Sequence, residues 1–174
     1  MSTSIFQRVS VLRVLGVIIS DTLCWKPQIC DILSRVCQRL FIIRCLKDVL
    51  STKELVTVYH AIITSVILYA SPTYGNLSMQ LKLKLERFQR RAHRLICGRD
   101  CGCEKFPAIS RLLSDRGLRY LEGCEKLKSH PLHQLVPKRL ENSGHLVLSH
   151  SSTNRRLHSF FPWFCAVANG TLVS

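Results

Sequence analysis

The sequence predicts a mainly α-helical protein with a short β strand or hairpin at its N-terminus and a loosely structured C-terminal tail. Three segments between residues 26 and 98 repeat apolar side chains at helical spacing, and residues that start or stop helices flank them. Residues 9–20 are instead rich in Val, Ile and Leu, which predicts a strand or hairpin arm covered on both faces. We therefore expect a β segment at 1–24, a three-helix bundle at 25–98 and an extension of short helices and loops at 99–174.

The first predicted helix runs from Lys26 to Leu50, with Pro27 at its first position. Cys30, Cys37 and Cys45 lie among its apolar residues, so we expect small buried hydrophobes in a reducing compartment. The chain is accordingly expected to be intracellular, either nuclear or cytoplasmic. The predicted buried stripe repeats at spacings of three and four: Ile29, Leu33, Val36, Leu40 and Ile43.

The second predicted helix begins with a capping box, in which the Ser51 hydroxyl accepts from the Glu54 amide and the glutamate reaches back. The residues that follow are apolar nearly all round, so we expect this helix to be the central one. Pro72 and Gly75 are expected to end it.

The third predicted helix runs from Ser78 to Cys97, and Gly98 stops it. Its buried stripe is expected to be Leu81, Leu85, Phe88, Ala92 and Leu95. The opposite face carries a strip of cations, since residues three, four and seven apart share a face: Lys84, Arg87, Arg90, Arg91 and Arg94. Such a strip can follow nucleic-acid phosphates, although an ordinary solvated helix face has the same pattern.

Signals beyond Gly98 are weaker. Residues 109–113 and 118–128 are predicted as two short helices, although Gly117 and Gly123 weaken the helical pattern. Loop is expected from Ser129 onward, and the apolar segment 160–167 is expected to dock back on the core. Four aromatic residues are interpreted as core rather than base-stacking platforms: Trp25, Phe160, Phe161 and Trp163.

The charge balance favours a polyanionic partner. The chain has 25 Lys and Arg against 11 Asp and Glu, a formal charge of +14. Residues 76–130 hold thirteen basic and six acidic side chains, a net of +7, whereas residues 1–75 have a net of +4 and the remainder +3. Cations that replace counterions on phosphates bind nucleic acid without reading its sequence. We therefore expect the backbone of RNA or DNA as the partner, and no small-molecule substrate.

Several segments in order resemble the region after the polymerase motif in non-LTR, LINE-type retrotransposon reverse transcriptases. Leu15-Gly16-Val17 resembles the family's YLGV segment near the primer grip, although Val14 replaces its tyrosine. "LYASPTYGNL" at 68–77 and "LERFQRRAHRLICG" at 85–98 are similar to LEYASPVWGNL and LERVQRRALRIICG. The resemblance implies a truncated RNA-directed DNA polymerase that retains the palm end, a thumb that grips template–primer duplex, and the region downstream.

Polymerase chemistry requires two metal ions held by clustered carboxylates. The five aspartates include no adjacent pair and no Tyr-x-Asp-Asp turn. We therefore expect no catalytic residue and no polymerase activity from this chain alone, and magnesium would belong to the parent enzyme. We also expect no membrane segment, because the longest uncharged stretch, 55–81, contains His60, Pro72 and Gly75.

A zinc site is conceivable but not favoured. Cys97, Cys101 and Cys103 precede Cys124, His130 and His133, at spacings that match no common zinc motif. We interpret them as unrelated free cysteines, and we expect no cofactor.

One alternative comes from a different functional class: a folded but functionless remnant of a decayed element. The same region resembles a segment known as the amino-terminal domain of an AlkB homologue. No histidine here has an Asp or Glu two residues later, as the iron site of such an oxygenase would need.

Overall fold

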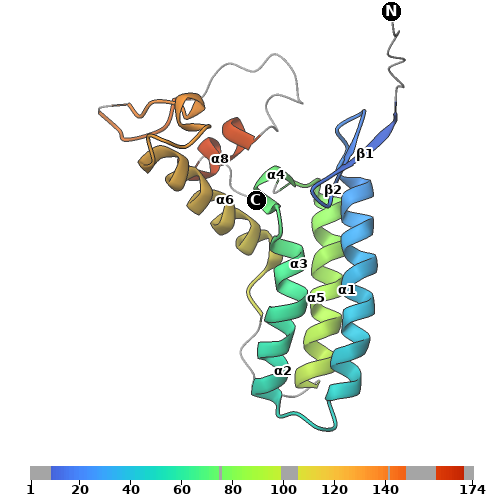
Figure 1. The fold of residues 1–174 in the computed structure, drawn as a ribbon. Helices are drawn as coiled ribbons and strands as arrows, with labels where there is room; N and C mark the ends of the chain where they lie inside the picture. Colours follow the sequence, from blue (N-terminus) through green and yellow to red (C-terminus); the bar gives the residue numbers. More distant parts are fainter. Residues whose placement is uncertain (1–8, 75, 99–105, 141, 148–159, 171–174) are drawn as a thin grey trace, which may run out of the picture. The chain divides into compact units, whose positions relative to one another are not determined.

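The computed structural model describes residues 9–74, 76–98, 106–140, 142–147 and 160–170. These residues are mainly helical after an N-terminal β hairpin, which confirms the predicted fold class (Figure 1). The chain divides into two compact units, residues 1–66 and 67–174. The boundaries predicted at residues 24 and 98 stay predictions.

Unit 1 opens with an antiparallel hairpin of β1 (Val11–Val14) and β2 (Val17–Ser20). Its two-residue turn, Leu15 and Gly16, has φ of 48° and 81°, the left-handed conformations that a tight hairpin turn requires. Every residue of β1 is exposed, whereas both ends of β2 are buried. The prediction that this segment is covered on both faces is therefore wrong. The reason is that β2 packs against the first helix and β1 lies beyond it.

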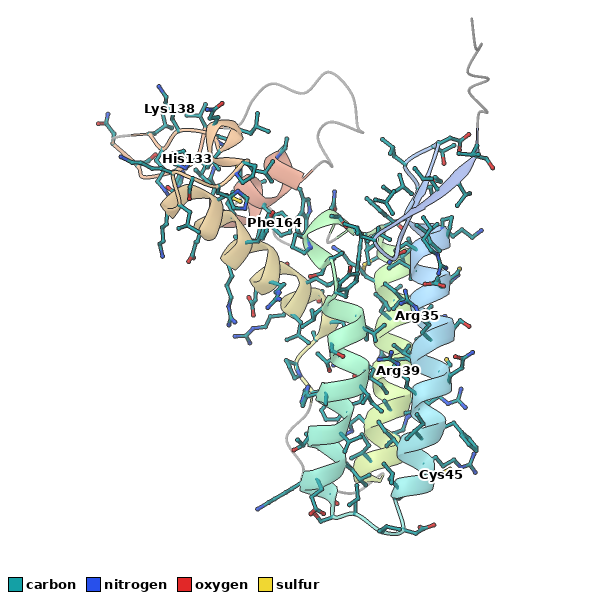
Figure 2. The ribbon with its side chains drawn as sticks, viewed as in Figure 1. Arg35, Arg39, Cys45, His133, Lys138 and Phe164 are labelled. Atoms are coloured by element: carbon teal, nitrogen blue, oxygen red, sulfur yellow. The ribbon has the colours of Figure 1, made fainter. Side chains whose placement is uncertain are left out.

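Helix α1 (Lys26–Leu46) ends four residues before the predicted end. Its buried stripe is Gln28, Ile29, Ile32, Val36, Leu40 and Ile43. Cys30 and Cys37 each directly follow a buried residue, so a rotation of about 100° per residue turns them away from the core. Cys30, Cys37 and Cys45 are all exposed, which corrects the prediction that they are buried. Figure 2 shows Cys45 near the end of α1.

Helix α2 (Thr52–Tyr59) continues into one π-helical turn, η1 (His60–Thr64), and then α3 (Ser65–Leu68). The predicted capping box is confirmed: the Ser51 amide donates to Glu54 Oε2 at 2.8 Å, and the Glu54 amide donates to Ser51 Oγ at 3.5 Å. Two side chains satisfy carbonyls of the π turn, since Arg39 Nη1 donates to Ile62 O and Ser65 Oγ donates to Ala61 O, each at 2.5 Å.

The helical segment that begins with α2 ends with α3 at Leu68, before Pro72 and earlier than predicted. Ala70 has a φ of 52°, and Pro72 lies inside the short helix α4 (Ser71–Tyr74). The buried Tyr74 hydroxyl lies within hydrogen-bond distance of the Ile67 and Tyr69 carbonyl oxygens. The side chain of Tyr74 therefore satisfies carbonyls that the helix end leaves unpaired.

Unit 2 contains α5 (Met79–Cys97), α6 (Ile109–Lys126), the 3-10 turn η2 (His133–Leu135) and α8 (Phe160–Ala168). Helix α6 is continuous where two short helices were predicted. Its Gly117 is buried, and a Cβ added there would lie 1.7 Å from the Phe164 ring. Gly117 therefore admits an aromatic ring instead of breaking the helix.

The prediction that the last apolar segment docks on a core is confirmed within unit 2. Phe164 of α8 is fully buried beside α6, in a cluster with Leu121, Leu146 and Trp163 (Figure 2). The Asn169 side chain accepts from the Leu146 amide and donates to the Leu146 carbonyl, both at 2.9 Å. These two hydrogen bonds fix the end of α8 to the extended segment around residue 146.

Candidate nucleic-acid interface

The predicted cationic strip lies on α5, and all five of its side chains are exposed. The apolar face of the same helix is buried through Leu81, Leu85, Phe88, Ala92 and Ile96, with Ile96 in the place expected for Leu95. From Lys84 to Arg94 the strip extends over about 15 Å of helix axis. The geometry therefore presents a single exposed row of cations: Lys84, Arg87, Arg90, Arg91 and Arg94.

Acidic side chains neutralise little of this strip. Glu86 lies beside it and approaches Arg90 at 3.9 Å, near the limit for an ion pair. Within the residues that the structure describes, this is the one salt bridge made by the strip. The remaining guanidinium and ammonium groups keep their charge for a ligand.

The flank of α5 explains why the strip stays open. The start of α6 and the segment before it contact one flank of α5. Gln89 Nε2 of α5 donates to the Pro107 carbonyl oxygen at 2.7 Å. Ser110 Oγ of α6 donates to the Glu86 carboxylate of α5 at 3.5 Å. His93 stacks edge-on against Phe106 with centroids 5.0 Å apart. These contacts use the side of the helix next to the strip, so unit 2 is assembled without covering the cations.

Helix α6 provides the contrast within the same unit. Arg111 pairs with Asp115 at 3.9 Å, and Lys126 pairs with Glu122 at 3.7 Å. Glu125 receives two hydrogen bonds from Arg139, at 2.6 and 2.8 Å. The cations of α6 are thus interspersed with carboxylates, as on an ordinary solvated helix face.

Some of the candidate zinc residues lie close together, but those that the structure describes do not form a metal-binding group. Cys97 is buried, and burial raises the pKa of its thiol; Cys101 and Cys103 lie outside the described residues. His130 Nε2 lies 3.9 Å from Cys124 Sγ, whereas His133 Nδ1 lies 2.9 Å from the Cys124 carbonyl oxygen. Among residues that the structure describes, no group of three His, Cys, Asp or Glu could hold a metal ion.

Of the four aromatic residues predicted to be core, the structure describes the side chains of two. Trp163 is buried in the unit 2 core, as predicted, and Trp25 is half-buried. Lys82 Nζ lies 5.9 Å from the centre of the Trp163 ring, so this cation is drawn toward the core and not toward the strip. The side chains of Phe160 and Phe161 lie outside the described residues.

Sequence reasoning missed a second charged cluster, in unit 1. The Asp31 carboxylate accepts from Arg13 at 3.1 Å and from Arg35 at 2.5 Å. Arg13 comes from β1 and Arg35 from α1, so this cluster ties the hairpin to the helix. The i, i+4 spacing of Asp31 and Arg35 was visible in the sequence, but the third partner depends on the tertiary fold.

Comparison of the chain with protein-family models, with curated proteins and with solved structures finds no match. The resemblance to reverse transcriptases therefore stays a prediction. Across the described residues, no helix combines the length and the apolar character needed to cross a bilayer.

Proposed function

We propose that this chain binds nucleic acid through the backbone phosphates, using the cationic strip of α5. The observation that carries the proposal is the strip itself: five exposed cations on one helix face, with one carboxylate contact at 3.9 Å. The resemblance of this helix to the thumb of LINE-type reverse transcriptases supports the same ligand. We propose further that the chain is a truncated polymerase of a mobile element, which holds a strand but does not extend it.

Phosphate binding by such a strip depends strongly on salt. Each neutralised phosphate releases condensed counterions, so the logarithm of the affinity falls with the logarithm of salt by about 0.9 per contact on duplex DNA. Five contacts give a slope no steeper than about −4.5. The strip reads no base edges, so the expected binding is independent of sequence.

The test compares two variants of the full chain that lose the same charge. In the α5 variant, the five strip residues become Gln. In the α6 variant, five exposed cations of the same unit become Gln: Arg111, Arg116, Arg119, Lys126 and Lys128. Each variant lowers the formal charge from +14 to +9, so net charge is matched.

Fluorescence anisotropy with labelled duplex DNA, RNA–DNA hybrid and single-stranded RNA then separates the possibilities at low salt. The proposal predicts that the α5 variant binds at least about a hundredfold more weakly, and the α6 variant within about threefold of wild type. Equal losses would attribute binding to net charge, and no binding by wild type would favour the functionless remnant.

A further inference from the structure

The two edges of the β hairpin differ in how their backbone groups are used. On β2, the Ile18 amide donates to Gln28 Oε1 at 2.7 Å, and the Ser20 carbonyl accepts from the Leu23 amide at 2.9 Å. Gln28 is 1% exposed, so helix α1 holds this acceptor in place. The outer edge of β2 is therefore closed by the protein itself.

The outer edge of β1 is open. The Asp21 amide donates to Ser10 O at 2.9 Å, which places Ser10 on the side facing the other strand. Because hydrogen-bonding direction alternates along an antiparallel strand, Val11 and Arg13 direct their amides and carbonyls away from β2. In the described part of the chain, no backbone hydrogen bond to those two residues is present outside the hairpin.

The open edge is also apolar. Val11 is 51% exposed and Leu12 53%, and the turn residue Leu15 is 85% exposed. A row of unpaired backbone groups flanked by apolar side chains is a template for another strand. A two-stranded sheet is marginal in water, and further strands stabilise it.

We propose that the outer edge of β1 pairs antiparallel with β1 of a second copy of this chain, about a two-fold axis at Leu12. In this register Val11 lies opposite Arg13 of the second copy, so the outward amides and carbonyls of both residues form a ladder. Leu12 then faces Leu12 of the second copy in a close, non-hydrogen-bonded pair. The result is a continuous four-stranded sheet.

Charge and the bounds of β1 favour this register over its neighbours. The Arg13 guanidinium is already balanced by Asp31 at 3.1 Å, and β1 holds no other charged residue. A shift of two residues toward the turn would place Arg13 directly opposite Arg13 of the second copy, where like charges repel. A shift of two residues the other way would pair Val11 with Val11 and leave Arg13 opposite Val9, which lies outside β1. A shift of one residue would place backbone amides and carbonyls that point away from β2 opposite backbone groups that point toward the second copy's β2, so the ladder could not form.

The first experiment is sedimentation equilibrium of the full chain under reducing conditions, over about 10 to 500 µM, because short strands bury little area and associate weakly. Wild type is expected to approach the mass of a dimer, and Leu12→Lys to stay monomeric. Ile42→Lys is the matched control: Ile42 is 50% exposed but lies on α1, so this variant should dimerise like wild type. A monomeric wild type, or equal behaviour of both variants, would overturn the proposal.

A cross-linking experiment tests the register and does not depend on Leu12→Lys folding normally. Leu12→Cys is made in a background in which Cys24, Cys30, Cys37, Cys45, Cys101 and Cys103 are Ser. Oxidation should give a disulfide-linked dimer, because the two thiols would lie directly opposite each other. Leu15→Cys in the same background is the control, because residue 15 is more exposed than residue 12 but lies away from the proposed two-fold axis at Leu12. Its cross-linking should be at least about tenfold less. Equal cross-linking by the two variants would contradict the register. These outcomes are independent of nucleic-acid binding by α5.

Discussion

Helices α5 and α6 belong to the same unit and have similar lengths, 19 and 18 residues, yet their charged faces differ. One of the five cations on the outer face of α5 lies near a carboxylate, at 3.9 Å, whereas two of the four cations of α6 lie near acidic neighbours on the same helix, at 3.9 and 3.7 Å. Helix α5 contains six basic residues and one acidic residue, whereas α6 contains four basic and three acidic residues. If α5 binds phosphates as proposed, the placement of acidic residues, together with the number of cations, distinguishes its face from the solvated face of α6.

The buried faces differ as well. Helix α6 receives the Phe164 ring of α8 at Gly117, so it organises the core of unit 2. The contacts of α5 with the start of α6 are confined to its flank. We therefore expect substitutions in the buried face of α6 to change stability, and substitutions in the strip of α5 to change binding.

The largest expected effect is at Gly117. Gly117→Ala forces a Cβ into the Phe164 ring and should lower the free energy of unfolding by about 3 kcal/mol. In a Phe164→Ala background the ring is gone, so the same change should cost less than about 0.5 kcal/mol. Urea denaturation of the four proteins of this cycle measures the coupling. Additive costs would show that the ring contact does not explain the glycine.

A binding effect of intermediate size is expected from two residues of the strip. Arg87→Gln with Arg91→Gln should weaken binding to duplex DNA about tenfold at moderate salt, because two phosphate contacts are lost. The melting temperature should stay within about 2 °C of wild type, since both side chains are exposed. The pair Arg116→Gln with Arg119→Gln on α6 is the control. A tenfold loss in that control would remove the distinction between the two helices.

Breaking the ion pair between Glu125 of α6 and Arg139 should have a smaller effect on stability. Glu125→Gln removes the negative charge and one of the two acceptor oxygens of a partly exposed pair, and should cost about 1 kcal/mol at neutral pH. Hydrogen bonds from Arg139 hold the pKa of Glu125 below its ordinary value, so its contribution is present above that value and is lost as pH falls through the lowered pKa. Stability measured from pH 7 to 3 should therefore fall less steeply in Glu125→Gln than in wild type. Parallel curves would contradict this.

The smallest effect is expected at the N-terminus of α5. Ser78 occupies the N-cap position but makes no capping hydrogen bond through its side chain. Ser78→Ala should therefore change the free energy of unfolding by less than about 0.5 kcal/mol, whereas Ser51→Ala at the capped helix α2 should cost about 1 kcal/mol. Thermal unfolding followed by circular dichroism measures both. A larger loss in Ser78→Ala would assign a capping role to Ser78.

Local patterns in the sequence predicted the features that depend on nearby residues. Ser51 and Glu54 are three residues apart and satisfy each other, and the strip of α5 follows from helical periodicity alone. The errors arose where a distant residue decides the outcome. Gly117 was interpreted as weakening a helix. Its role in accepting the ring could not be seen locally, because Phe164 lies 47 residues later in the chain.

The exposure of β1 and of the α1 cysteines could not be predicted for the same reason. Apolar composition indicates that a segment can be buried, but a second layer must be present to bury it. In the described structure β1 pairs with no strand other than β2, and Cys30 and Cys37 follow buried positions of α1 by one residue. The sequence pattern therefore predicted where the strand and the helix form. Which of their side chains are buried depends on the face that each turns toward its neighbours.

The most direct test of the central claim is the salt dependence of duplex DNA binding by wild type, the α5 variant and the α6 variant, each with five substitutions. Between about 50 and 200 mM salt, wild type and the α6 variant should share a log–log slope of about −3 to −4.5, and the α5 variant should approach zero. Equal slopes for the two variants would contradict the account, because the phosphate contacts would then not reside on α5.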